Sequence, residues 1–151
     1  MKILISACLL GVNCRYDGSD NRVQPWVEAL AGHQLIPVCP EQLGGMATPR
    51  APSEIVSEAP LRVLAKTGED VTAAFAAGAA ETLKLARLLE ARCAVLKERS
   101  PSCGVNAIYD GTFSGTRLPG QGMTARLLAA EGLRLYSEEE LDRFLREEAH
   151  I

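Results

Sequence analysis

The sequence predicts a single α/β domain over residues 1–151, in which a mostly parallel β-sheet is flanked by helices. Short runs rich in Ile, Leu and Val alternate along the chain with longer amphipathic segments, the order typical of parallel sheets covered by helices. A chain of 151 residues suits one domain with a proper core. Its 47% hydrophobic and 23% charged residues are ordinary globular values, which argues against disorder.

The strands are expected where apolar runs are bounded by turn residues. The three clearest are "KILISAC" (2–8), "QLIPVC" (34–39) and "CAVLKE" (93–98). Two shorter candidates are "AIYD" (107–110) and "LRLYS" (133–137), and the second is expected to be a further parallel strand.

Four helices are expected between and after these strands. The strongest pattern opens with acidic residues, is dense in Ala and Leu, and carries apolar side chains at three- and four-residue spacing. The last helix begins with the capping-box pair Ser137 and Glu140. The four segments are 25–32, 69–92, 123–132 and 137–148.

The segment 40–68 contains four of the eight prolines and is predicted to be a long irregular loop. Loops of that length inside a compact domain are usually functional. We therefore expect this segment to contribute to a binding or catalytic site.

Charge and hydropathy exclude several function classes. The formal net charge is −3 and the Lys and Arg residues are scattered, so neither a nucleic-acid polymer nor a membrane surface is an expected partner. The opening "MKILISACLLG" has one Lys and a very short apolar run, so it is interpreted as a first strand and not a signal peptide. No stretch approaches the ~18 apolar residues that a membrane span needs. A cytoplasmic protein is expected.

The chain has five cysteines, an odd number in a sequence without secretory features. That favours free, metal-binding or catalytic thiols over a disulfide framework. There is no Cys-x-x-Cys pair and there are only two histidines, so an ordinary zinc finger has no support. The cysteines are Cys8, Cys14, Cys39, Cys93 and Cys103.

Three of these cysteines are predicted to meet at one edge of the sheet. Cys8 closes the first expected strand, Cys39 closes the second, and Cys103 lies on the turn "SPSCG" just after the third. Ligands of parallel sheets bind beyond the carboxyl ends of the strands, so a metal site is expected at this edge. The turn should make Cys103 accessible, because turns lie at the surface. Cys93 opens its strand and should be a buried core residue at the opposite end.

Three converging thiolates can bind several kinds of metal ion or metal cluster. Soft thiolate ligands select zinc, Cu(I) or iron–sulfur clusters, and a site with one open coordination position is typical of catalysis. The spacing equally allows Cys8 and Cys39 to cap their strands and pack as small hydrophobic residues. Cys14 is either a fourth ligand or a spare thiol.

Polar residues next to these cysteines are candidates for catalysis. Glu41 lies two residues beyond Cys39, and Ser100 lies three residues before Cys103, so each is within reach of a group bound there. Alternatively, Glu41 is a solvated loop carboxylate and Ser100 a turn-forming residue.

Two further segments belong at the same edge. "GVNCRYDG" brings Asp17 into the loop after the first strand, although an Asp-Gly pair alone is typical of a turn. "PGQGMTA" (119–125) brings Gly122 to the start of a helix, whose free N–H groups can hold an anion or a carbonyl oxygen.

Four motifs together closely resemble the thiouracil desulfidase family of small bacterial proteins. They are "SACLLGVNCRYDG", "CPEQLGGMATPR", "KERSPSCG" and "IYDGTFSG" followed by "PGQGMTA", in the family's order and over nearly the whole chain. The resemblance implies a [4Fe–4S] cluster held by Cys8, Cys39 and Cys103, with the fourth iron open to the sulfur of a thiolated nucleobase. It also implies acid–base and substrate-contacting roles for Glu41 and Ser100.

The implied reaction is a non-redox desulfuration of thiouracil to uracil and sulfide, with the thiolated base as the small-molecule partner. A thiocarbonyl sulfur is soft and suits an open iron, while a carboxylate relays protons as water attacks the ring carbon. Three rival functions remain: a zinc or copper thiolate module without catalysis, a thiol enzyme with Cys103 as nucleophile, and a nucleotide-binding domain built on "PGQGMTA". The thiol enzyme lacks a well-placed base, because His33 precedes a strand and His150 lies in the C-terminal tail.

Overall fold

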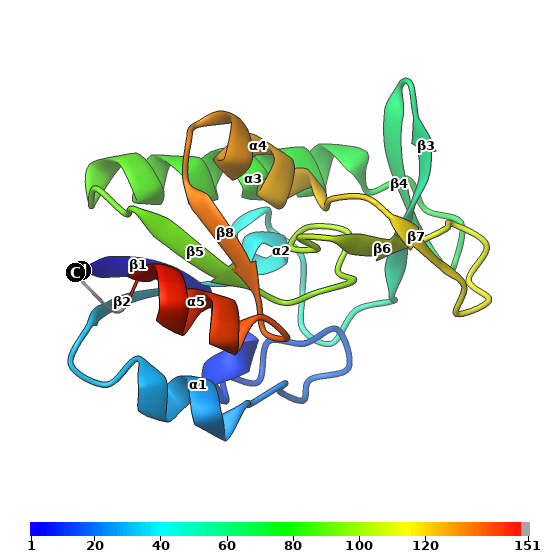
Figure 1. Ribbon diagram of the computed structural model, residues 1–151. Coiled ribbons are helices and arrows are strands. Elements are labelled where there is room, and N and C mark those ends of the chain that lie inside the picture. The colour runs from blue at the N-terminus through cyan, green and yellow to red at the C-terminus, as the bar shows by residue number, and fades with distance from the viewer. Residues whose placement is uncertain (149–151) are drawn as a thin grey trace.

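A four-stranded sheet lies at the centre of the computed structural model, which describes residues 1–148 (Figure 1). Its strand order is β2-β1-β5-β8, and each neighbouring pair is parallel. The predicted fold class is confirmed, including the expected parallel strand near the C-terminus. The strands are β1 (Lys2–Ser6), β2 (Gln34–Val38), β5 (Cys93–Leu96) and β8 (Arg134–Ser137).

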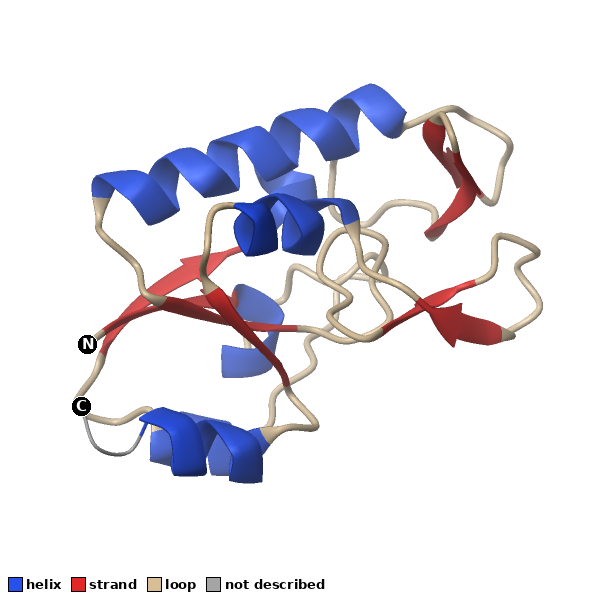
Figure 2. Ribbon diagram, turned by 45° about the horizontal axis from the view of Figure 1, so that its top comes forward, coloured by secondary structure: helices blue, strands red, loops and turns tan. Residues whose placement is uncertain are grey.

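Helices cover both faces of this sheet, as Figure 2 shows. One face packs on α1 (Gln24–Ala29) and α5 (Leu141–Glu148), and the other on α3 (Thr72–Leu88) and α4 (Met123–Ala130). Successive side chains of a strand point to opposite faces, and Ile3, Leu4 and Ile5 at the centre of β1 are all apolar and fully buried, so both faces of this strand are covered. This pattern explains why the strands appear in the sequence as uninterrupted apolar runs.

The four predicted helices are all present, and each is shorter than its sequence pattern. The predicted helix 69–92 begins only at Thr72, and the predicted helix 137–148 begins at Leu141. The Ser137 N–H donates to the Glu140 carboxylate at 2.9 Å, as in a capping box, but Ser137 is the last residue of β8 and the pair lies in the turn before α5, so it does not begin the helix as predicted. No helix within residues 1–148 has the length and apolar character to cross a bilayer.

The prediction of a long irregular loop over 40–68 is wrong. The segment forms the short helix α2 (Pro40–Leu43) and an antiparallel pair of strands, β3 (Ser53–Glu58) and β4 (Leu61–Ala65). Its prolines occupy places where a donor N–H is not needed: Pro40 is the first residue of α2, and Pro60 lies in the turn between the strands.

A second antiparallel pair lies beside the first. The predicted strand 107–110 forms β6 (Ala107–Tyr109), but it pairs with β7 (Arg117–Pro119) and not with the parallel sheet. Both two-stranded sheets extend beyond the carboxyl ends of the central strands (Figure 1). They thus flank the edge at which the sequence predicts a site.

The position of α2 depends on a glycine contact with α3. A Cβ atom on Gly78 would lie 1.9 Å from the Pro40 carbonyl oxygen, and one on Gly44 would lie 2.1 Å from the Ala74 carbonyl oxygen. Only glycine permits backbones to approach this closely. The contact fixes the start of α2, and with it the residues next to Pro40.

We predict that Gly78→Ala destabilises the protein although alanine is the better helix former. The clash with Pro40 should outweigh the propensity gain and lower the free energy of unfolding by about 1–3 kcal/mol, the usual cost of overpacking. Urea unfolding measures the change. The control is Ala77→Gly at an exposed position of α3, which should cost about 1 kcal/mol from propensity alone. A stabilised Gly78→Ala protein would contradict the close packing.

Candidate functional site

A cavity of about 810 Å³ opens at the carboxyl edge of the sheet. Its wall includes residues that follow β1, β2 and β5, together with residues of the β3–β4 and β6–β7 pairs. The side chains of greatest chemical interest in this wall are those of Cys8, Cys14, Cys39, Cys103, Glu41 and Ser100.

The fold brings Cys8 and Cys39 together by a slightly different route from the one expected. β1 ends at Ser6, so Cys8 lies in the short 3₁₀ helix η1 (Ala7–Leu10) and not in the strand. Cys39 directly follows β2 and is the N-cap residue of α2. Since β1 and β2 are parallel neighbours with Ser6 opposite Val38, both thiols come to the same edge.

Cys14 lies in direct contact with these two thiols. It is buried, with 3% of its surface exposed, and its S–H donates to Cys39 and Cys8. Donation to Cys39, and secondarily to Cys8, raises the pKa of Cys14. The same hydrogen bonds lower the pKa of Cys8 and bring that of Cys39 to about 6. Cys14 is therefore the least acidic of these three thiols, and Cys39, with a pKa of about 6, readily forms a thiolate at neutral pH.

Cys103 is less accessible than its turn suggests. The residue is only 4% exposed, and it is one of the residues that line the cavity. Burial raises the pKa of this thiol to about 12, so it is protonated at neutral pH. His33 does not line the cavity, and His150 lies outside the described residues. These features disfavour a thiol enzyme with Cys103 as nucleophile.

Cys93 has the place expected of it. It opens β5, is fully buried, and packs in the apolar cluster between the sheet, α1 and α5. Burial raises its pKa to about 12. Cys93 is thus a core residue at the opposite end of its strand from the cavity.

A buried carboxylate shapes the loop that presents Ser100 and Cys103. Oε1 of Glu98 accepts the backbone N–H groups of Val105, Asn106 and Ala107 at 2.8–3.1 Å. Burial favours the neutral acid, but these N–H donors outweigh it and lower the pKa of Glu98. Through these hydrogen bonds Glu98 holds the loop closed, and no sequence motif indicated this role.

A line of oxygen atoms connects Ser100 to Glu41. The Ser100 Oγ lies 2.9 Å from the Ser102 Oγ and accepts the backbone N–H of Cys103 at 3.0 Å. The Ser102 hydroxyl in turn lies within donating distance of two acceptors, the Glu41 carboxylate at 3.4 Å and the Cys103 sulfur at 3.5 Å, and its one proton can serve either. The structure therefore joins Glu41, Ser100 and Cys103 through Ser102, which the sequence analysis missed.

Arg50 is a third residue that the sequence analysis missed, after Glu98 and Ser102. Its side chain is only 7% exposed, and its guanidinium lies next to three residues of the site. The guanidinium donates to the Glu41 carboxylate at 3.2 Å and to the Cys14 carbonyl at 2.9 Å, and it lies 3.9 Å from the Cys39 sulfur. The available signal was its place at the end of "CPEQLGGMATPR".

Comparisons with known proteins give one consistent result. The model of the 2-thiouracil desulfurase family matches residues 3–140. This chain belongs to that family. YbbK of Bacillus subtilis (strain 168), described as an uncharacterized protein, is 42% identical over 150 residues, which cover 95% of this chain and 99% of YbbK.

A solved structure agrees with the family assignment. It is that of the [4Fe-4S]-dependent thiouracil desulfidase TudS, which is 41% identical to this chain and superimposes with a TM-score of 0.91. The match covers 99% of both chains. The likeness to this desulfurase-family structure therefore includes the β3–β4 and β6–β7 pairs as well as the central sheet.

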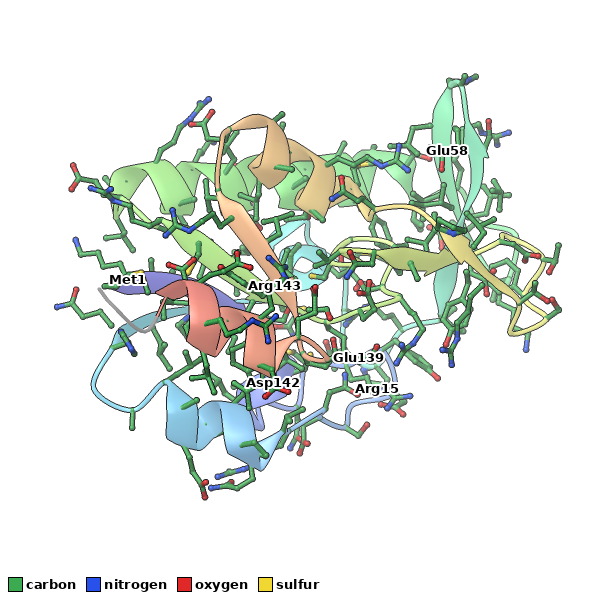
Figure 3. The ribbon with its side chains drawn as sticks, in the orientation of Figure 1. Met1, Arg15, Glu58, Glu139, Asp142 and Arg143 are labelled. Atoms are coloured by element: carbon green, nitrogen blue, oxygen red, sulfur yellow. The ribbon has the colours of Figure 1, made fainter. Side chains whose placement is uncertain are left out.

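Asp17 and Gly122, which the sequence analysis placed at the site, do not line the cavity. Asp17 is exposed, accepts hydrogen bonds from Ser19, and pairs with Arg15 at 3.6 Å; Arg15 is labelled in Figure 3. Gly122 begins α4, and a Cβ atom there would lie 2.5 Å from the Ser102 carbonyl carbon. The backbone at Gly122 thus packs directly against the turn that precedes Cys103.

The thiols are not arranged around a single point. Within residues 1–148, no three histidine, cysteine or acidic side chains come close enough together to hold one metal ion. Cys8, Cys39 and Cys103 instead face the cavity from different segments.

We predict that Glu98→Gln destabilises the protein in a pH-dependent way. Because the folded state lowers the pKa of Glu98, its stabilisation is complete above the ordinary value of about 4.3 and fades as the pH falls through the lower folded value. The variant should lose about 1–3 kcal/mol at pH 7, the scale of charge-assisted hydrogen bonds. Urea unfolding in metal-free buffer at pH 7 and pH 3.5 measures the difference, which should shrink at the lower pH.

The matched control is Glu139→Gln. Glu139 is 57% exposed in its ion pair with Arg99 and lies at the surface (Figure 3), so its replacement should change stability by less than about 1 kcal/mol. An equal loss for Glu98→Gln at both pH values would mean that Glu98 acts by packing and not by charge.

Proposed function

We propose that this protein binds a [4Fe–4S] cluster through Cys8, Cys39 and Cys103 and hydrolyses the C=S bond of a thiolated nucleobase, converting thiouracil to uracil and sulfide. One observation carries the proposal: three thiols from separate segments line one cavity, beside a carboxylate linked to two serine hydroxyls. The 41% identity to a [4Fe-4S]-dependent thiouracil desulfidase supports it.

The donor set suits the cluster. Iron–sulfur clusters are bound by cysteine thiolates, and a cluster is larger than a single ion, so its ligands need not meet at one point. Three cysteines leave one iron open, and this iron supplies a soft Lewis-acid position for a thiocarbonyl sulfur. Cys14 is not needed as a ligand, because Cys8, Cys39 and Cys103 already supply the three thiolates.

Glu41 is proposed to handle the protons. Hydrolysis adds the oxygen of water to the ring carbon and releases the sulfur as sulfide, so protons must leave the water while no electrons are exchanged with a redox partner. Glu41 accepts the hydroxyl proton of Ser102, whose oxygen contacts Ser100, and these hydroxyls offer a path for positioning water or relaying a proton. Arg50 holds the carboxylate in this orientation.

The alternative is a zinc or copper thiolate module without catalysis. It would require the three thiols to draw together around one ion, and residues 1–148 contain no such group as they stand. Iron and acid-labile sulfide in anaerobically prepared protein, with brown visible absorption, distinguish a cluster from zinc. Protein that holds zinc and no sulfide would refute the proposal.

We predict opposite outcomes for two cysteine substitutions. Cys103→Ser should abolish iron binding or leave a cluster too labile to isolate, because it removes a proposed ligand. Cys93→Ser should keep full iron content and lose about 1–3 kcal/mol of stability, because it buries a hydroxyl in an apolar cluster. Iron content and urea unfolding of both proteins provide the comparison. Iron lost from Cys93→Ser and retained by Cys103→Ser would reverse the proposed roles.

We predict that Glu41→Gln separates cluster binding from chemistry. The amide keeps the size and hydrogen-bonding shape of the carboxylate but cannot take up and return a proton. The variant should assemble the cluster and bind the thiolated base, while turnover falls roughly 10²–10⁴-fold, the usual scale for a lost acid–base group.

Iron, sulfide and desulfuration rate must be measured on the same preparation of Glu41→Gln. An intact cluster with unimpaired turnover would remove Glu41 from the mechanism. A lost cluster would instead give Glu41 a structural or ligating role.

A further inference from the structure

One wall of the cavity has no part in the proposed proton chemistry. The chain has one Trp, three Tyr and three Phe residues. Four of these are buried in the core, namely Trp26, Phe75, Tyr136 and Phe144. All of the others, which are Tyr16, Tyr109 and Phe113, line the cavity. Aromatic side chains that the core does not use are thus concentrated at this one site.

Phe113 is held toward the cavity by an unusual backbone. It lies at the tip of the β6–β7 pair with a φ of +57°, a left-handed conformation that bulky residues rarely adopt. The buried Glu54 accepts the Phe113 N–H at 3.2 Å and the Gly111 N–H at 2.9 Å. Gly111 lies so close to β3 that a Cβ atom there would be 2.7 Å from the Ile55 carbonyl oxygen. The tip is therefore fixed to β3.

Ser53, which precedes Glu54 in β3, has a hydroxyl group that forms no hydrogen bond within the described residues. It is 8% exposed, and its Oγ has no hydrogen-bond partner among residues 1–148. It lines the main cavity, and it also borders a small recess together with Tyr109. A buried hydroxyl without a partner is costly, so an orphan Oγ on a cavity wall indicates a polar group of a ligand.

We propose that Ser53, Tyr109 and Phe113 form the subsite for the pyrimidine ring, with an aromatic face stacking on the ring and the Ser53 hydroxyl bonding one of its polar ring-edge atoms. This inference rests on the proposed function and deepens it by naming the residues that hold the ring of the thiolated base. Aromatic side chains stack on any base, whereas a hydroxyl can both donate to and accept from the base edge. The Glu54 carboxylate positions the tip, because it accepts the backbone N–H groups of Gly111 and Phe113.

The test compares flat and puckered ligands. Uracil and 5,6-dihydrouracil carry the same carbonyl and N–H groups, but only uracil is aromatic and flat. Calorimetric titration of the cluster-loaded protein should give at least about tenfold tighter binding of uracil, the scale of base stacking. Phe113→Leu keeps an apolar side chain at the same backbone position. In this variant the ratio of the dissociation constant of 5,6-dihydrouracil to that of uracil should fall to near one, whereas Phe113→Tyr should retain the wild-type ratio.

Steady-state kinetics with 2-thiouracil provide a second readout. Phe113→Leu should raise KM about tenfold and leave kcat within a few-fold, because stacking holds substrate and transition state alike. Ser53→Ala should raise KM about three- to tenfold, the scale of one neutral hydrogen bond. The matched control is Leu118→Ala on β7, an exposed residue of the same hairpin that does not line the cavity. It should change neither KM nor the ligand preference.

The outcomes separate this inference from the proposed function. An unchanged KM and an unchanged uracil preference in Phe113→Leu, with normal wild-type desulfuration, would overturn the subsite alone. A wild-type protein that releases no sulfide from thiouracil, yet binds uracil through Phe113, would overturn the proposed function and leave the subsite standing. If Phe113→Leu loses iron, Ser53→Ala decides the question instead: a KM unchanged from that of the wild type would overturn the subsite, because this substitution removes only the proposed hydroxyl contact.

Discussion

The central position of β1 is the constraint on which the site depends. β1 pairs in parallel with β2 on one side and with β5 on the other, with Ile5 opposite both Pro37 and Val95. The three strands therefore end at the same level, and whatever follows them must share one edge. Cysteines separated by 31 and 64 positions in the sequence reach one cavity for this reason, without any short ligand motif. A slip of one residue in this register would send the buried side chains of β1 to the wrong faces and disperse the thiols together with the core.

Parallel pairing brings segments together, but buried charged groups set their final geometry. Glu98 closes the loop before Cys103, Arg50 ties Glu41 to the loop around Cys14, and Glu54 fixes the tip that carries Phe113. Each of these groups satisfies backbone N–H or C=O groups that loops would otherwise leave to water, which is how irregular segments can be buried at all. Each spans residues that are distant in the chain or in different elements. The result is a rigid polar frame around a cavity, which suits a site that must hold reacting groups in fixed positions.

The sequence predicts the parts of this protein that repeat a regular pattern. The apolar runs gave the four parallel strands, the three- and four-residue spacing gave the helices, and strand ends located the cysteines, Glu41 and Ser100 at one edge. It failed where partners are far apart in the chain. The strands of 53–65 were missed because their prolines suggested a loop, and Arg50, Ser102 and Glu98 were missed because their value lies in contacts that no local pattern records. The burial of Cys103 was missed for the same reason, since a turn is exposed unless other segments cover it.

The cavity is built from two structural units, and this division has a consequence for specificity. The central sheet supplies the thiols through residues that follow β1, β2 and β5, whereas the β3–β4 and β6–β7 pairs supply Ser53, Tyr109 and Phe113. The paired strands form separate sheets, so a change at their tips does not disturb the ladder that aligns the thiols. Residues that recognise a ligand are most easily varied when they lie on loops carried by a rigid scaffold. Under the proposed function and the proposed subsite, the shape of the accepted heterocycle can therefore change through the hairpins while the chemistry at the sheet edge stays the same.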